Sequence, residues 1–291
     1  MATGVDAPAM PRRDQFVTID GRELHYSEWG TPDDPPVVCV HGLSRVGRDF
    51  DPIAAVLEED YHVLCLDMPG RGMSEWAGLP MEEYTGASMA ERCVSFCDEL
   101  GLEQLRWIGT SMGGMIGIEL AGGALGDRIT HLVLNDVGPA AAQDEAADEG
   151  LERIIEYLTN PPAFERLSEL EAYYRETYEP FSEMSDAEWR RFTTTSYRRN
   201  QAGEFMPAYD TSVVEPLLKE DPPIAQWDKW ENIDVPTLVL KGEHSDILAD
   251  ATFEEMQSRR PEIETRTYDC GHAPALNVPE HTDPIVSLLN Q

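Results

Sequence analysis

Short apolar runs alternate with helical patterns along most of this chain, and this alternation constrains the fold more than any other feature. The apolar runs have the length of strands, and turn signals or helically spaced stretches separate them. The runs predicted as strands are Val37–Val40, Tyr61–Leu66, Leu105–Ile108, Ile129–Val137, Val235–Leu240 and Ile263–Tyr268. Before them, Phe16–Asp20 and Glu23–Trp29 flank Gly21 and predict a hairpin. The pattern as a whole predicts an α/β fold whose mostly parallel sheet has helices on both faces.

The alternation stops at Gly138-Pro139 and resumes only at Val235. The intervening segment is helical and acidic in character, and it contains more than half of the chain's aromatic residues. We expect most of these aromatic side chains to form the segment's own core. The interruption predicts a helical cap, residues 139–231, inserted into a single α/β core made of residues 1–138 and 232–291.

Acidic residues outnumber basic residues by 55 to 22, which gives the chain a formal net charge of −33. A field this negative repels nucleic acid and anionic membranes, so the composition argues against partners of either kind. Only three of the basic residues are lysines. Excess acid with little lysine suggests adaptation to salty surroundings, because salt screens the self-repulsion of such a chain.

The apolar runs, the N-terminal residues and the cysteines argue against a membrane-spanning protein, a secreted protein and a metal-binding protein. No apolar run approaches the roughly 18 residues that a membrane span needs, and Met1–Gln15 lacks the apolar stretch of a secretory signal. We therefore expect a cytoplasmic protein with a loose N-terminus. The five cysteines are an odd number without metal-binding spacing, which predicts reduced thiols and no metal site.

One pentapeptide, Gly109-Thr110-Ser111-Met112-Gly113, matches the pattern G-x-S-x-G between a predicted strand and a predicted helix. In that context the pattern is typical of a nucleophile on a sharp turn, where residues without a Cβ atom must flank a strained serine. Ser111 is the predicted nucleophile.

A serine hydroxyl needs a neighbouring base to remove its proton. His272 follows the last predicted strand in a loop bounded by Gly271 and Pro274, and it is the predicted base. His25, His62 and His131 lie in or beside strand patterns and His281 lies near the terminus, positions that make the case for each of them weaker.

The third member should be a carboxylate at the end of a strand, between the serine and the histidine in the chain. Asp246 lies in the loop after the strand Val235–Leu240 and is the preferred acid. Asp136 closes the strand after the nucleophile's helix and is the alternative. Glu243 is a weaker third candidate.

Two backbone N–H groups should stabilise the oxyanion that forms when the serine attacks a carbonyl. One belongs to Met112, the residue after the nucleophile. The other belongs to Leu43, in the loop His41-Gly42-Leu43-Ser44 after an early strand.

Taken together, these segments resemble the α/β-hydrolase superfamily in its capped, single-domain form. The resemblance rests on His41-Gly42, the loop Asp67–Ser74, the Ser111 turn, the loop Gly242–Asp246 and Gly271-His272. It implies an eight-stranded sheet, a catalytic triad and no cofactor.

The family also narrows the chemistry. Members that act on haloalkanes and epoxides use aspartate at the position of Ser111, so those activities are disfavoured. Ala273 stands where many carbon–carbon bond hydrolases have tryptophan. A carboxylesterase or lactonase acting on small to medium, neutral or hydrophobic substrates is the preferred function. Carbon–carbon hydrolysis, cofactor-free haloperoxidase activity, acyl transfer, lipase activity at oil interfaces and pure ligand binding stay as alternatives.

Overall fold

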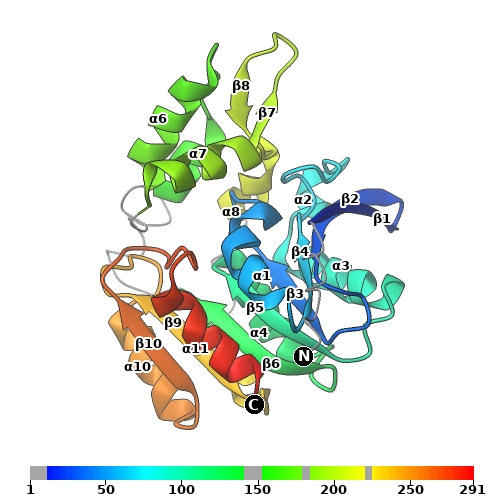
Figure 1. Cartoon of the computed structure of the whole chain (residues 1–291), viewed down its shortest axis with the longest axis vertical. Coiled ribbons are helices and arrows are strands. Elements are labelled where there is room, and N and C mark those ends of the chain that lie inside the picture. Colours follow the sequence, from blue (N-terminus) through cyan, green and yellow to red (C-terminus); the bar gives the residue numbers. More distant parts are fainter. Residues whose placement is uncertain (1–11, 141–152, 179–183, 220–224) are drawn as a thin grey trace, which may run out of the picture.

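An eight-stranded sheet runs through the computed structural model, which describes residues 12–140, 153–178, 184–219 and 225–291. The strand order is β1-β2-β4-β3-β5-β6-β9-β10 (Figure 1). The strands are β1 (Arg13–Ile19), β2 (Arg22–Trp29), β3 (Pro36–Val40), β4 (His62–Leu66), β5 (Leu105–Thr110), β6 (Ile129–Asn135), β9 (Thr237–Gly242) and β10 (Glu264–Tyr268). The pairs β1–β2 and β2–β4 are antiparallel, and the other pairs are parallel. The predicted mostly parallel sheet is confirmed.

The first two strands form the predicted hairpin. Asp20 and Gly21 connect them with φ values of 49° and 77°. Two consecutive residues with positive φ are what a tight two-residue hairpin turn requires. Of the N-terminal stretch Met1–Gln15 that was predicted to be loose, residues 1–11 lie outside the described residues. Residues 13–15 belong to β1, so that part of the prediction is wrong.

Helices cover both faces of the sheet and explain why its central strands read as unbroken apolar runs. Alternate residues of β3 point to opposite sides, so Val38 packs in a cluster with α3, α4 and α10 while Cys39 packs in another with α1 and α11. These helices are α1 (Asp51–Leu57), α3 (Gly86–Glu99), α4 (Met112–Ala121), α10 (Asp250–Arg259) and α11 (Pro279–Leu289). Short helices η1 (Gly47–Phe50) and α2 (Pro80–Glu83) complete this part.

The segment predicted as a cap lies between β6 and β9 in the chain. Its described elements are α6 (Leu167–Tyr178), α7 (Asp186–Thr195), β7 (Tyr197–Arg199), β8 (Phe205–Pro207), η2 (Thr211–Val214), α8 (Glu215–Lys219) and α9 (Trp227–Asn232), and residues 153–159 are helical. In Figure 1, α6, α7 and the β7–β8 hairpin stand together at the top, beyond the sheet. Tyr174, Tyr178, Trp189 and Phe205 form a separate cluster there, so these aromatic residues do build the segment's own core.

The hairpin β7–β8 departs from the all-helical expectation. Each of its strands has three residues, and Gly203 in the connecting turn has a φ of 84°. A period of two cannot be recognised over three residues, which is why the sequence pattern did not indicate it.

The five cysteines are free thiols, as predicted, and four of them are buried. Among the helices that the structure describes, none has the length and apolarity that crossing a bilayer would require.

Candidate active site

Ser111 occupies a strained turn between β5 and α4. Its backbone has a φ of 52° and a ψ of −117°, a region that residues with a Cβ atom rarely adopt. A Cβ atom on Gly109 would lie 2.3 Å from the carbonyl oxygen of Gly113, and one on Gly113 would lie 1.9 Å from the carbonyl oxygen of Val40. Only glycine fits at either position, so both glycines of the motif are steric requirements of this turn.

His272 lies in the loop after β10, where it is buried and lines the same cavity as Ser111. Its Nδ1 atom is 2.6 Å from Oδ2 of Asp136. A carboxylate at this distance accepts a hydrogen bond from the N–H group at Nδ1, so Nε2 is left as the basic nitrogen of the ring. The structure therefore brings the predicted nucleophile and the predicted base into one cavity.

Asp136 follows β6 directly, is fully buried, and accepts hydrogen bonds from two groups besides His272. The backbone N–H of Gly242 donates to Oδ1 at 2.7 Å, and the Ser245 hydroxyl donates to Oδ2 at 2.5 Å. A buried carboxylate is costly unless such donors satisfy it. These bonds hold the carboxylate in place against the imidazole.

The preference for Asp246 as the acid is corrected by this geometry. Its carboxylate is partly exposed and forms an ion pair with Arg153 at 2.8 Å. The loop after β9 directs Ser245 toward Asp136, and the next residue points elsewhere. The alternative acid of the sequence analysis, Asp136, is the carboxylate that contacts His272.

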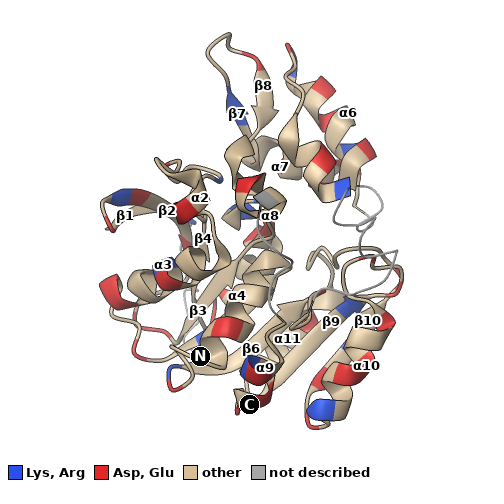
Figure 2. Cartoon of the chain, turned by 180° about the vertical axis from the view of Figure 1, so that it is seen from behind, with Lys and Arg blue, Asp and Glu red and all other residues tan. Residues whose placement is uncertain are grey.

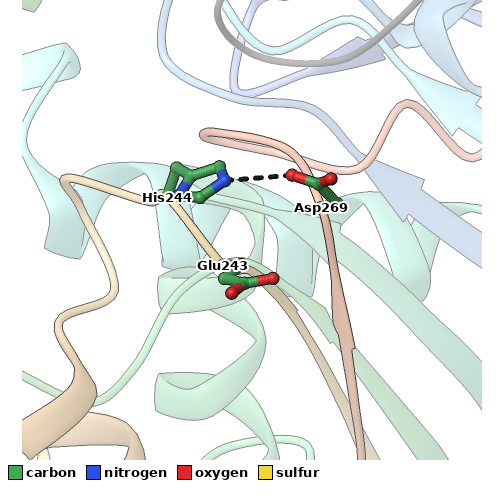
Figure 3. A group of neighbouring side chains, drawn as sticks. All are labelled: Glu243, His244 and Asp269. Atoms are coloured by element: carbon green, nitrogen blue, oxygen red, sulfur yellow. Dashed lines mark hydrogen bonds and ion pairs between the residues drawn. The ribbon is translucent and has the colours of Figure 1, made fainter.

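Glu243, the third candidate acid, is exposed and lies with His244 and Asp269 on the outer surface (Figure 3). Nε2 of His244 is 2.9 Å from Oδ1 of Asp269, and potential ligand atoms of all three residues lie within 4.8 Å of one another. All three side chains are open to solvent, where carboxylates commonly gather without a metal ion. This cluster shares no residue with the lining of the Ser111 cavity.

The loop that contains Leu43 passes directly against the nucleophile. A Cβ atom on Gly42 would lie 3.6 Å from Cβ of Ser111. His41 fixes this loop, because its Nδ1 is 2.7 Å from the carbonyl oxygen of Gly42 and its Nε2 accepts the N–H of Met68 at 3.0 Å. Burial lowers the pKa of His41 to about 4, against an opposing effect of nearby Asp67, so the ring is neutral at pH 7.

A buried arginine that the sequence analysis did not single out connects the two predicted oxyanion residues. Arg71 is fully buried, and its Nε donates to the carbonyl oxygen of Leu43 at 2.9 Å. Its Nη1 donates to the carbonyl oxygen of Pro69 at 2.7 Å, and its Nη2 is 3.6 Å from Sδ of Met112. Burial lowers the pKa of Arg71 to about 10. The one sequence signal was its place between Gly70 and Gly72 in the loop Asp67–Ser74.

The cavity beside Ser111 has a volume of about 130 Å³ and is lined by residues of the sheet domain and of the segment between β6 and β9. Its apolar lining includes Phe50 and Leu276 from the former and Ile154, Tyr157 and Phe192 from the latter. A cavity of about 150 Å³ accommodates a benzene molecule, so this space suits a small organic group.

Hydrogen bonds join the segment between β6 and β9 to the loops that carry the site. Asn277, five residues after His272, donates to Glu188 of α7 at 2.7 Å. The hydroxyls of Ser44 and Tyr178 lie 3.1 Å apart. The segment between β6 and β9 is thereby attached to both the His272 loop and the Leu43 loop.

Comparisons with known proteins identify the family and agree with the fold. Residues 35–277 match the sequence profile of the α/β-hydrolase-fold family. The chain is 36% identical over 280 residues to a 3-hydroxybutyrate-oligomer hydrolase of Cupriavidus necator, and the match covers 91% of this chain and 93% of that protein. The crystal structure of an α/β hydrolase from Novosphingobium aromaticivorans superposes with a TM-score of 0.85 at 34% identity, covering 96% of this chain and 98% of the other.

Proposed function

This chain belongs to the α/β-hydrolase family, and we propose that it is a serine hydrolase of carboxylic esters with Ser111, His272 and Asp136 as its catalytic triad. The observation that carries the proposal is the 2.6 Å contact between Nδ1 of His272 and Asp136, in a cavity that also contains the strained Ser111. A nucleophile, a base and a group that orients the base are the parts that acyl transfer requires.

In the first half of the reaction, Nε2 of His272 accepts the hydroxyl proton of Ser111 while the serine oxygen attacks the ester carbonyl. Asp136 stabilises the imidazolium that forms and is not itself protonated. The tetrahedral intermediate collapses, the carbon–oxygen bond of the ester breaks, and the alcohol leaves with the proton from His272. The acyl group is then bound to Ser111.

In the second half, His272 takes a proton from water, and the resulting hydroxide attacks the acyl carbonyl. Collapse of this second intermediate releases the carboxylic acid and returns the proton to Ser111. The net reaction is ester plus water to acid plus alcohol. No step calls for a cofactor.

The negative oxygen of each intermediate would be stabilised by the N–H groups of Leu43 and Met112. Gly42 lies against Ser111, which supports the first donor, and Met112 begins α4, whose N-terminal N–H groups favour negative charge. Arg71 bonds to the carbonyl oxygen of Leu43 and would hold that peptide in register.

The class of substrate follows from the cavity and from the relative. A 3-hydroxybutyrate oligomer is a chain of carboxylic esters, and the Cupriavidus necator protein is named for its hydrolysis. We include short hydroxyalkanoate esters among the proposed substrates, beside the small esters and lactones that the sequence favours. Residues 139–231 act in this proposal as a cap that closes one side of the acyl pocket.

Hydrolysis of p-nitrophenyl butyrate, together with covalent labelling by a fluorophosphonate, tests the proposal. The wild type and a Ser258→Ala control, altered on the exposed surface of α10, should turn over the ester and take up one label on Ser111. Ser111→Ala should fold normally, take up no label and lose nearly all turnover. A folded Ser111→Ala protein that retains wild-type turnover would show that another nucleophile acts.

A further inference from the structure

The charges around the cavity have the opposite sign to those of the chain as a whole. The sequence has 55 acidic and 22 basic residues, and Figure 2 shows acidic residues along the outer surfaces of α3, α6 and α10. The cavity beside Ser111 is nevertheless lined by Arg45, Arg48 and Arg191, and Asp49 is the only acidic residue in its described lining. A concentration of cations at this one place calls for a local explanation.

Two of these three arginines are compensated by neighbouring carboxylates. Arg45 donates two hydrogen bonds to Asp49, at 2.7 and 2.8 Å, and its guanidinium lies 3.5 Å from the centre of the Phe192 ring. Arg48 pairs with Asp51 at 2.6 Å. Each of these pairs is close to neutral, and each helps to build the wall of the cavity.

Arg191 differs from the other two because, among the described residues, no carboxylate lies within ion-pair distance of its guanidinium, although its charge acts on Asp51 and Glu188 at longer range. It lies on α7, which packs against η1, and its side chain is only partly exposed. Glu188, the acidic residue one turn earlier, accepts hydrogen bonds from Ser185 in the capping box of the helix and from Asn277. A partly buried guanidinium that lines a cavity and that no described carboxylate contacts directly is suited to binding an anion.

We propose that Arg191 binds a carboxylate group of the substrate and thereby selects esters that carry a free carboxylate near the scissile bond. This inference rests on the proposed function of Ser111, because it assigns the charge of that enzyme's substrate. A guanidinium donates two parallel hydrogen bonds to a carboxylate, which also fixes the orientation of the ligand. The sequence alone favours a neutral or hydrophobic acyl group, and the charge of the cavity argues for the opposite choice.

The net charge of −33 does not prevent this recognition. Salt at about 0.1 M screens exposed charges beyond roughly 10 Å, so the acidic outer surface acts weakly on a ligand inside the cavity. A charge-assisted hydrogen bond at contact distance in a partly buried site is screened far less.

The test uses two substrates that differ only in this charge. One is the ester-linked dimer of 3-hydroxybutyrate with its free carboxylate, and the other is the same dimer with a primary amide in place of the carboxylate. Arg191→Gln should lower the ratio of kcat/KM for the acid to kcat/KM for the amide by roughly 10- to 100-fold, the usual effect of one charge-assisted hydrogen bond. The matched control is Arg190→Gln, which removes the same charge from an exposed position on the same helix and should leave the ratio unchanged. An equal ratio for wild type and Arg191→Gln, or an equal fall in both arginine variants, would overturn the proposal.

A binding measurement separates this inference from the catalytic one. Calorimetric titration of Ser111→Ala with the two dimers requires no turnover. The acid should bind at least about ten-fold more tightly than the amide, and the double variant Ser111→Ala/Arg191→Gln should lose that difference. Equal binding of both dimers to Ser111→Ala would refute carboxylate recognition even if the wild type is an active esterase. Failure of the wild type to hydrolyse any ester would refute the catalytic proposal and leave the titration to decide the role of Arg191.

Discussion

Replacing Asp136 by asparagine should reduce kcat by roughly 10⁴-fold, the effect of the corresponding change in a serine protease triad. The carboxylate oxygen that contacts Nδ1 of His272 at 2.6 Å also accepts the Ser245 hydroxyl at 2.5 Å, so it serves two donors at once. An asparagine that turned its oxygen toward these donors would bring its NH₂ group against the N–H of Gly242. An asparagine that turned the other way would donate to Nδ1 and stabilise the wrong tautomer of the imidazole. In that tautomer Nε2 carries the proton and cannot act as the base.

The matched control is Asp246→Asn, which makes the same chemical change at the acid that the sequence favoured. Its carboxylate takes part in a partly exposed ion pair with Arg153, with 26% of the Asp246 side chain accessible. An exposed pair is worth at most about 1 kcal/mol, which corresponds to a change of no more than about five-fold in kcat. The two substitutions should therefore differ by roughly three orders of magnitude.

The assay is the initial rate of p-nitrophenyl butyrate hydrolysis at saturating substrate, with circular dichroism and urea unfolding as checks of the fold. Asp136 is fully buried, so its substitution should also lower the free energy of unfolding, and rates must be compared in buffer without urea. If Asp246→Asn reduces kcat more than Asp136→Asn does, the assignment of the acid is refuted.

Three further predictions follow from other parts of the structure. Arg71→Met should lower kcat by roughly 10- to 100-fold with little change in KM, because the peptide of Leu43 loses the hydrogen bond that holds it. One oxyanion donor is worth about 3 kcal/mol of transition-state stabilisation. A change in KM alone would contradict this prediction. The pKa of His41 is about 4 when folded, below its ordinary value of 6.5, so the unfolded chain takes up the proton first as the pH falls. Acidification from pH 7 to pH 4 should therefore remove about 3 kcal/mol of stability through His41. Urea unfolding of the wild type and of His41→Gln at both pH values measures this effect. The difference between their free energies of unfolding should become smaller by about 3 kcal/mol at pH 4. The thermal unfolding midpoint should rise between 0.1 and 1 M sodium chloride, where the screening length falls from about 10 to about 3 Å, and a flat response would remove the case for salt adaptation.

The features that the sequence predicted well are those that a few neighbouring residues determine. The Ser111 turn is such a case, since its strain and its two glycines belong to one pentapeptide between a strand and a helix. The buried strands are another, because each contains an apolar run of three or four residues between turn signals.

The acid could not be chosen from the sequence because the choice depends on side-chain direction at the ends of two strands far apart in the chain. β6 and β9 are neighbours in the sheet, and candidate carboxylates follow both. In the loop after β9, Ser245 donates a hydrogen bond to Asp136, whereas the next residue, Asp246, forms an ion pair with Arg153. No periodicity or composition reports such a difference.

The charge of the cavity is another property that only the fold reveals. Arg48 and Arg191 are more than a hundred residues apart and lie on different parts of the molecule, yet both line the same space. The average composition argued against nucleic acid and anionic membranes as partners, and such an average does not reveal a single arginine that lines a cavity.

Because two donors share one oxygen of Asp136, the carboxylate beside His272 could be supplied from a second position in the chain. Ser245 and His272 donate to the same atom, so position 245, in the loop after β9, lies two hydrogen bonds from the imidazole. A carboxylate introduced there would have a short path to Nδ1 of His272. The acid could therefore move between the two strand ends in successive substitutions, through an intermediate protein that keeps a carboxylate beside the histidine throughout.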